Sequence, residues 1–190
     1  MKTLLISLKI FFFLTILTGI AYPLFVTGIA QLAFPAKANG SLIVEDNQII
    51  GSELIGQLFD STIYFTSRPS VVSYNPLPSG GSNYGLTNIK LKNLVVERRN
   101  QFNAFNRLDS LVEIPSEMLF ASASGLDPHI SPQAALLQVK RIVNTRHFDE
   151  SQKQQLLKYI IDLSEPPQYS LFGEHRMNVL LLNLSLDEIR

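Results

Sequence analysis

The chain has 190 residues, 46% of them hydrophobic, and its 16 basic side chains equal its 16 acidic ones in number. It contains no cysteine, which excludes disulfide bonds, a thiol nucleophile and the common cysteine-ligated zinc sites. Residues 1–38 carry three lysines and no acid, so the remainder carries a small net negative charge. Because surfaces that bind nucleic acid are basic, this balance excludes DNA and RNA as expected partners.

The first predicted element is a membrane-spanning helix over residues 10–34, a stretch without any charged side chain. At the helical rise of about 1.5 Å per residue it reaches about 37 Å, enough for a hydrocarbon core of about 30 Å. The alternative is a cleaved secretory signal, with Lys2 and Lys9 ahead of the stretch and a small-residue cleavage site at residues 36–38. The length favours a retained anchor, since the apolar part of a signal is usually about 7–15 residues.

The lysines that flank this helix predict its orientation in the membrane. Lys2 and Lys9 lie on one side, and Lys37 alone lies close by on the other. Since positive charge is retained in the cytoplasm, we expect residues 1–9 to be cytoplasmic and residues 35–190 to form an extracytoplasmic domain.

The predicted span also has features of a helix with a protein neighbour. Pro23 lacks an amide hydrogen, so the carbonyl of Gly19 loses its helical partner and a kink is expected. Thr15 and Gly19 form a small-xxx-small pair, and Gly28 adds another small position at which a second backbone can approach closely.

In the first part of the domain the sequence predicts short strands, a short helix and a long loop. Residues 41–44 and 48–50, separated by a polar turn, predict a β-hairpin. Residues 52–59 predict a short helix, and residues 64–65 a short strand. Residues 67–87 are rich in proline, glycine, serine and asparagine, which predicts a long loop of the kind that is often functional.

Three helices follow. The first covers residues 88–107, and the second begins at Ser131, the N-cap before a proline in the first turn. The third begins at Asp149 or Ser151 and ends before two consecutive prolines. Residues 178–186 alternate leucine with polar residues over part of their length, which predicts a strand. The expected fold class is therefore α+β, with one membrane helix, a small sheet and several helices.

One segment suggests catalysis, because Ser124, Asp127 and His129 lie close together in the sequence. A catalytic triad is assembled from separate elements, however. In addition, Ser124 does not lie in a G-x-S-x-G elbow, the sequence motif typical of a serine nucleophile. A tight loop leading to the Ser131 cap explains the same residues. The alternatives are thus a non-enzymatic accessory protein, which the residues favour, and a membrane-anchored extracytoplasmic hydrolase that uses Ser124 and His129.

Several short motifs occur in an order that is more specific than any one of them. They are YPL at 22–24, ANGSLI at 38–43, GSELIGQ at 51–57, YF at 64–65, RPS at 68–70, SGGSN at 79–83, SASGLDPHIS at 122–131, NVL at 178–180 and NL at 183–184. Together they resemble the C subunit of the Kdp potassium-transporting ATPase over nearly the whole chain. Two small departures are Ser67, where glycine is usual, and His175, where proline is usual.

The resemblance implies a subunit of a complex in the bacterial inner membrane, and not an enzyme on its own. The implied partners are a channel-like potassium-binding subunit, a P-type ATPase subunit and a very small stabilising subunit, besides membrane lipid. The implied function is to assist assembly and, as a catalytic chaperone, to raise the affinity of the ATPase subunit for ATP. The family's proposed nucleotide-contacting glutamine corresponds to Gln138, which makes ATP the implied ligand and Gln138 its expected contact. No metal ligand is implied.

Topology complicates that contact, since Gln138 is predicted to lie outside the cell and ATP inside it. A second implied role fits the topology better, with the extracytoplasmic domain over the outer mouth of the channel-like subunit and the Pro23 helix against its flank.

Overall fold

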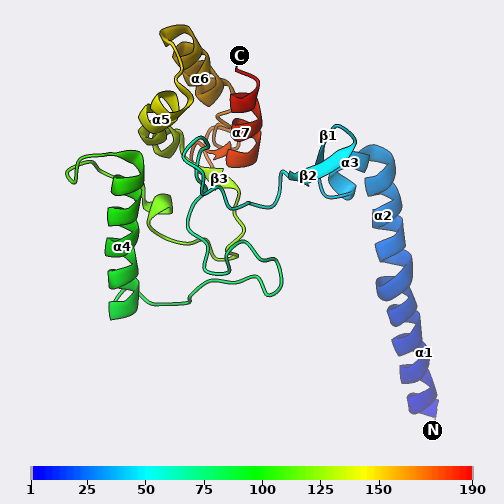
Figure 1. Cartoon of the computed structure of the whole chain (residues 1–190). Helices are drawn as coiled ribbons and strands as arrows, with labels where there is room; N and C mark the ends of the chain where they lie inside the picture. The colour runs from blue at the N-terminus through cyan, green and yellow to red at the C-terminus, as the bar shows by residue number, and fades with distance from the viewer. Residues whose placement is uncertain (1, 190) are drawn as a thin grey trace. The chain divides into compact units, whose positions relative to one another are not determined.

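The computed structural model describes residues 2–189 and divides into two compact units, one up to Ser52 and one from Glu53 onwards (Figure 1). The first unit begins with α1 (Lys2–Ile16), a π-helical turn η1 (Leu17–Ala21) and α2 (Tyr22–Ala33). These three elements form one continuous helix, which is long and apolar enough to cross a membrane. It includes nearly all of the predicted span and begins eight residues earlier, at Lys2.

Proline explains the irregular turn in this helix. In η1 the hydrogen bonds skip one residue, so the amide of Tyr22 donates to the carbonyl of Leu17, five residues back. Pro23 follows immediately and has no amide hydrogen to offer. The helix thus changes its bonding pattern in the turn before the proline, as proline-associated π-turns do.

A short helix α3 (Pro35–Ala38) and the predicted hairpin complete the first unit. Strands β1 (Leu42–Glu45) and β2 (Gln48–Ser52) pair antiparallel. Asp46 and Asn47 between them have left-handed φ angles of 47° and 63°. This is the geometry that two-residue hairpin turns require, so the hairpin prediction is confirmed.

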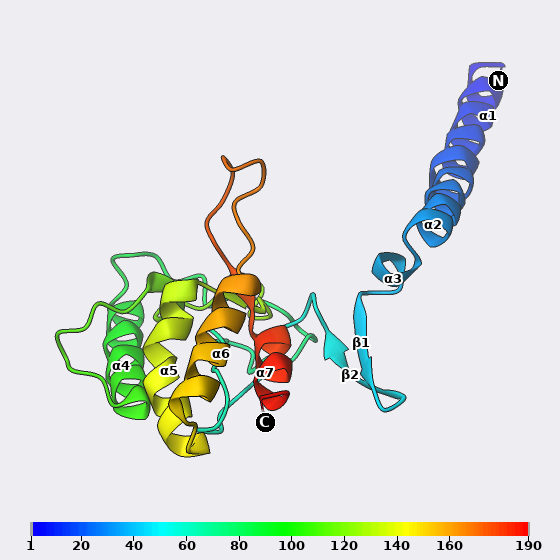
Figure 2. The same ribbon diagram turned by 90° about the horizontal axis from the view of Figure 1, so that it is seen from above.

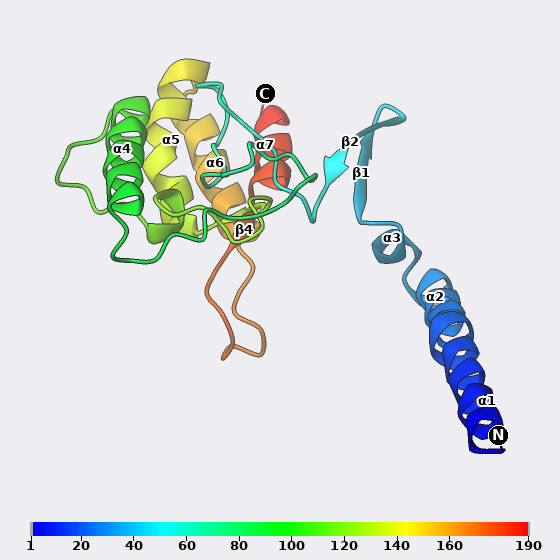
Figure 3. The same ribbon diagram turned by 90° about the horizontal axis from the view of Figure 1, so that it is seen from below.

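The second unit is a row of helices with a small sheet. Helices α4 (Ile89–Asn106), α5 (Pro132–Arg146), α6 (Glu150–Asp162) and α7 (Val179–Asp187) lie side by side in that order (Figures 2 and 3). A 3-10 turn η2 (Ser116–Met118) and the two-residue strands β3 (His129–Ile130) and β4 (Met177–Asn178) complete it, and β3 and β4 pair antiparallel. The mixed α+β class is confirmed.

Side chains from all four helices form one hydrophobic core with the loops beside them. Its fully buried members include Phe65, Ile130, Ile142, Leu156, Ile160, Met177, Leu182 and Leu186. Phe65 is the member from the irregular segment that precedes α4, so that segment is packed against the helices rather than free.

Three helices begin at the predicted residues, and in each the first predicted residue is the N-cap. The side chains of Asn88, Ser131 and Asp149 accept hydrogen bonds from backbone amides of the first turns of α4, α5 and α6. Asp149 rather than Ser151 begins α6, because it forms a capping box with Gln152. Residues 67–87 have no regular secondary structure, as predicted.

Three short predictions are wrong. Residues 179–186 lie in helix α7 instead of a strand, and of the predicted strand only Asn178 belongs to one, β4. Asn178 caps the amides of Leu180 and Leu181, and the leucines of this short helix are buried on most of its sides. Residues 52–59 contain turns instead of the predicted helix, and the apolar side chains of Leu54 and Leu58 are exposed. The predicted strand at Tyr64 and Phe65 is not formed: the amide of Tyr64 closes a turn by donating to the carbonyl of Ser61 at 3.2 Å, and neither residue has a strand partner among residues 2–189.

Candidate functional site

The segment 62–66 crosses the helical layer and is held by side chains in place of a neighbouring strand. The Asn183 amide, on α7, accepts from the Phe65 amide at 2.8 Å and donates to the Phe65 carbonyl at 3.0 Å. This two-way pairing is what a strand would provide. We call segment 62–66 and the side chains that hold it the clamp.

Gln138, on α5, makes the second two-way pair of the clamp. Its Oε1 accepts from the backbone amide of Thr66 at 2.8 Å and from the Thr66 hydroxyl at 3.0 Å. Its Nε2 donates to the Thr66 carbonyl at 3.3 Å. The side chain is fully buried, so the amide of Gln138 faces a backbone segment rather than solvent.

Arg141, one turn further along α5, is a buried cation among neutral acceptors. It donates to the Asn106 side chain at 2.9 Å, to Oε1 of Gln138 at 3.0 Å and to the carbonyl of Thr62. Its guanidinium lies 4.6 Å from the centre of the Phe105 ring. Burial lowers the pKa of Arg141 to about 10, yet the group stays charged at neutral pH.

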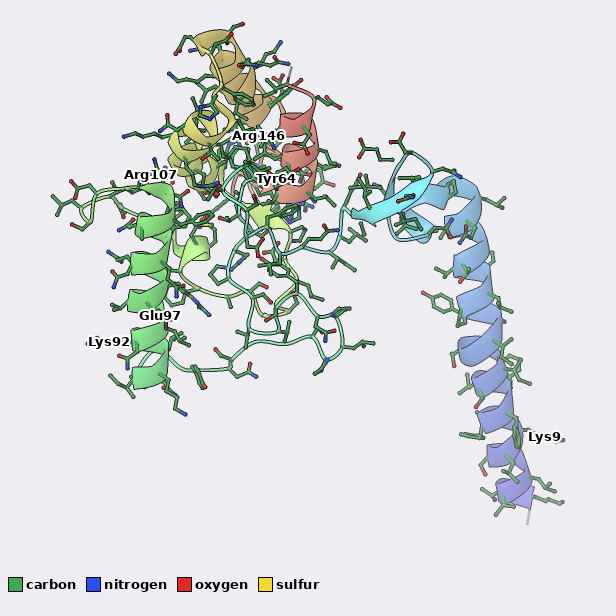
Figure 4. The ribbon with its side chains drawn as sticks, in the orientation of Figure 1. Lys9, Tyr64, Lys92, Glu97, Arg107 and Arg146 are labelled. Atoms are coloured by element: carbon green, nitrogen blue, oxygen red, sulfur yellow. The ribbon has the colours of Figure 1, made fainter. Side chains whose placement is uncertain are left out.

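A third set of side-chain contacts, centred on Arg146 of α5, completes the clamp. Arg146 donates to the carbonyl of Ile63 at 2.9 Å and to Asp187 at 2.6 Å, and lies beside the Tyr64 ring (Figure 4). The Tyr64 hydroxyl donates to the same carboxylate at 2.9 Å. The hydrogen bond to Asp187 raises the pKa of Tyr64, with burial and the carboxylate charge acting in the same direction.

A separate polar cluster lies in the loop before β3. Arg68 pairs with Asp127 at 2.5 Å, and Nδ1 of His129 lies 3.1 Å from the other oxygen of that carboxylate. Burial alone would raise the pKa of Asp127. The hydrogen bonds from the side chain and backbone of His129, together with the charge of Arg68, outweigh burial and lower that pKa to about 2.

The structure does not assemble the three residues of the hydrolase alternative into a triad. His129 contacts Asp127, but Ser124 Oγ accepts from the amide of Leu126 at 3.1 Å, a local turn contact. No hydrogen bond between Ser124 and His129 is found in the described part of the chain. The arrangement explains the motif as loop structure, with Asp127 also capping the amide of His129.

Glycines let the two motif-bearing loops touch. The amide of Gly80 donates to the carbonyl of Ser124 at 2.9 Å. A Cβ on Gly125, whose φ is +71°, would lie 2.7 Å from Val72 and 3.0 Å from the carbonyl of Gly80. The glycine at position 125 therefore allows the two loops to approach closely.

Beside the clamp lies a cavity of about 690 Å³ between the segment 58–74 and the second half of α4. Phe59, Phe102 and Phe105 line it together with Arg68 and Arg98. Its volume is in the range of small-molecule sites. Within residues 2–189 no group of three histidine, aspartate or glutamate side chains is placed to hold a metal ion.

Sequence reasoning missed most of the clamp. A glutamine in an amphipathic helix is ordinarily a solvated residue, and nothing in the sequence around Gln138 predicts its burial. The signal that could have identified the clamp is Arg141 itself. This cation lies on the buried face of α5, which also carries Ala134, Gln138 and Ile142. A buried cation at such a position requires acceptors from another segment.

The comparisons with known proteins agree over the whole length. The family model described as "K+-transporting ATPase, c chain" matches residues 4–188. Among curated relatives, the potassium-transporting ATPase KdpC subunit of Photorhabdus laumondii is 45% identical over 186 residues, covering 96% of this chain and 94% of the relative. The KdpC subunit of Dechloromonas aromatica is 46% identical over 193 residues, covering 100% and 99%. That of Pectobacterium atrosepticum is 45% identical over 191 residues, covering 99% and 97%.

The predicted resemblance is thereby confirmed, and the hydrolase alternative is not favoured. An apolar helix fit to anchor the chain and relatives that match over nearly its whole length lead to one assignment. The chain belongs to the KdpC family of potassium-transporting ATPase subunits.

Proposed function

We propose that this chain is the accessory, non-catalytic subunit of an ATP-driven potassium uptake complex. In this proposal it is a single-pass protein of the bacterial inner membrane with a cytoplasmic N-terminus. The observation that carries the proposal is the family match from residue 4 to residue 188, which includes both the membrane helix and the domain.

The proposed partners are the channel-like, ATPase and small stabilising subunits of that complex. The membrane helix binds the flank of the channel-like subunit, and its small residues and the π-turn before Pro23 allow close packing there. The second unit packs over the outer mouth of the same subunit. The exposure of nearly every side chain of the helix supports a role for it as a contact surface for lipid and protein.

Co-purification through a tag on this chain tests the proposal. Recovery of a P-type ATPase together with a potassium-channel-like subunit is the expected result. A second arm removes the domain from Glu53 onwards and keeps the membrane helix. Unchanged complex assembly and potassium uptake in that arm would contradict a role for the domain.

We also propose that the subunit raises the affinity of its ATPase partner for ATP. The test is the KM for ATP of the complex with and without this chain, and a several-fold lower KM in its presence is expected. An identical KM would contradict the catalytic chaperone role while leaving membership of the complex intact.

Direct contact of Gln138 with the nucleotide is a distinct hypothesis. Both polar atoms of its amide bind Thr66, so contact would require segment 62–66 to move away from α5. A photoreactive ATP analogue added to the whole complex tests this. Labelling of the peptide that contains residue 138 supports contact, and labelling confined to the ATPase subunit contradicts it.

A further inference from the structure

Between α6 and β4 the chain forms a hairpin that projects away from the helical layer (Figures 2 and 3). We call residues 165–176 the 165–176 hairpin. At its base, Glu165 and Arg176 exchange two backbone hydrogen bonds of 2.8 and 3.1 Å and pair their side chains at 3.0 Å. Nearer the tip, Gln168 and Phe172 exchange two more, of 2.9 and 3.0 Å.

The tip of the hairpin has a defined conformation. Tyr169 and Ser170 both have left-handed φ angles, 53° and 58°, and the amide of Leu171 donates to the carbonyl of Gln168 at 3.1 Å. The tip is thus a hydrogen-bonded β-turn within a three-residue loop between the paired residues Gln168 and Phe172. Because its backbone is already bonded, docking the tip would cost less conformational entropy than docking a free loop.

The side chains on this ordered tip are large, apolar and exposed. Tyr169 is 89% exposed, Leu171 79% and Phe172 67%. Burying such residues is the main source of binding free energy at protein interfaces, where tyrosine is among the residues that contribute most. Three of them together on a projecting hairpin form an apolar surface that residues 53–189 leave largely uncovered.

The charge of the hairpin indicates which kind of partner fits. Between Glu165 and His175 it has no lysine or arginine, and its one cation, Arg176, is paired with Glu165. Glu174 leaves the hairpin with a net negative charge. Segments that bind lipid surfaces generally carry lysine and arginine, so this charge disfavours an anionic membrane and favours a protein groove with a basic rim.

We propose that the tip of the 165–176 hairpin inserts Tyr169, Leu171 and Phe172 into an apolar groove on the extracytoplasmic face of another subunit of the transporter, with a cation of that subunit facing Glu174. The inference rests on the proposed function, since it takes its partner from the same complex. It assigns the contact to one hairpin rather than to the domain as a whole.

The test compares two variants of the full chain expressed with the other subunits. Leu171→Asp together with Phe172→Asp places two charges on the tip. Leu111→Asp is the matched control, because Leu111 is 90% exposed in a loop of the same unit outside the hairpin. We expect the tip variant to recover at least about tenfold less of the other subunits and the control to recover the wild-type amount.

The possible outcomes distinguish a failure of the proposed function from a failure of the hairpin inference alone. If the wild-type chain recovers no transporter subunit, the proposed function fails. If the wild type and the tip variant recover equal amounts, only the hairpin inference fails. Unchanged thermal unfolding of the tip variant alone shows that a loss of recovery is not a loss of folding.

Single-cysteine labelling separates a protein groove from lipid, and the absence of natural cysteines makes the label unique in this chain. A fluorophore on Ser170→Cys should be shielded from an aqueous quencher only when the complex is assembled. If nitroxide-labelled phospholipid quenches it in the chain reconstituted alone in phosphatidylethanolamine and phosphatidylglycerol vesicles, the tip binds lipid and the inference is overturned.

Discussion

Gln138, Arg141 and Asn183 each place a polar side chain inside the core, where an unpaired donor or acceptor is costly. Each is paired with the backbone of segment 62–66, so the cost of burial becomes a reason for that segment to hold one position. The clamp thus orders an irregular segment that has no strand partner in the described part of the chain. A polar network of this kind is stabilising only while every member is satisfied.

Replacing Gln138 by leucine tests the clamp. The substitution Gln138→Leu keeps the volume but leaves the amide and carbonyl of Thr66 and one N–H group of Arg141 without their partner. We expect a loss of about 2–4 kcal/mol in the free energy of unfolding. Near-ultraviolet circular dichroism of the full chain in detergent during unfolding measures it. Gln155→Leu, at an exposed position of α6, is the control and should change it by about 0.5 kcal/mol or less.

The lowered pKa of Asp127 predicts how the free energy of unfolding of the second unit changes in acid. Its pKa of about 2 in the folded chain lies below the unfolded value of about 3.9. The ionised carboxylate therefore stabilises the fold above about pH 4, and this contribution of about 2 kcal/mol is lost as the pH falls from about 4 to 2.

The variant Asp127→Asn should accordingly lose stability at pH 7 and show a flatter dependence of unfolding free energy on pH between 4 and 2. Unfolding curves at several pH values measure this slope. Asp162→Asn, at the exposed end of α6, is the control that should keep the wild-type slope. Equal slopes for Asp127→Asn and the wild type would show that the contacts of Asp127 with His129 and Arg68 contribute no acid sensitivity.

At the level of elements, the starts of the three long predicted helices are correct, whereas the short elements at residues 52–59, 64–65 and 178–186 are wrong. Asn88, Ser131 and Asp149 all begin helices as predicted, because an N-cap satisfies amides that belong to the same few residues. The leucines of α7 misled the prediction, since a short helix buried on most sides shows no clear 3.6-residue pattern.

Asn178 should matter more than an ordinary N-cap. It caps α7 and also donates to the backbone carbonyl of Glu53 at 2.7 Å. We expect Asn178→Ala to destabilise the second unit by about 2–3 kcal/mol. Asn88→Ala, which removes only the cap of α4, should cost about 1 kcal/mol. Thermal unfolding of both variants makes the comparison, and equal losses would mean that the Glu53 contact contributes nothing.

At the level of the whole molecule, the chain joins one helix fit for a membrane to a helical unit with a core of its own. The hairpin of residues 42–52 belongs to the first unit by its contacts, although the predicted extracytoplasmic domain begins at residue 35. The uneven distribution of charge sets the expected orientation, with Lys2 and Lys9 retained in the cytoplasm.

Cysteine accessibility tests that orientation. Thr3→Cys and Ser110→Cys each introduce the only cysteine of the chain. In spheroplasts a membrane-impermeant maleimide should label Ser110→Cys at once, and Thr3→Cys only after the membrane is opened. The reverse pattern would place the second unit in the cytoplasm and contradict the proposed contact with the outer mouth of the channel-like subunit.

The sequence by itself determined the long apolar helix, the hairpin of residues 42–52, the starts of α4, α5 and α6 and the family, because each depends on neighbours in the chain or on short motifs in a fixed order. Only the tertiary structure decided the clamp, the helical state of residues 179–187 and the exposure of the 165–176 hairpin tip. Gln138 and Thr66 lie 72 residues apart, and no local pattern reports which distant segment will satisfy a buried amide. For the same reason no local pattern reports that Tyr169, Leu171 and Phe172 are exposed, which only the fold decides.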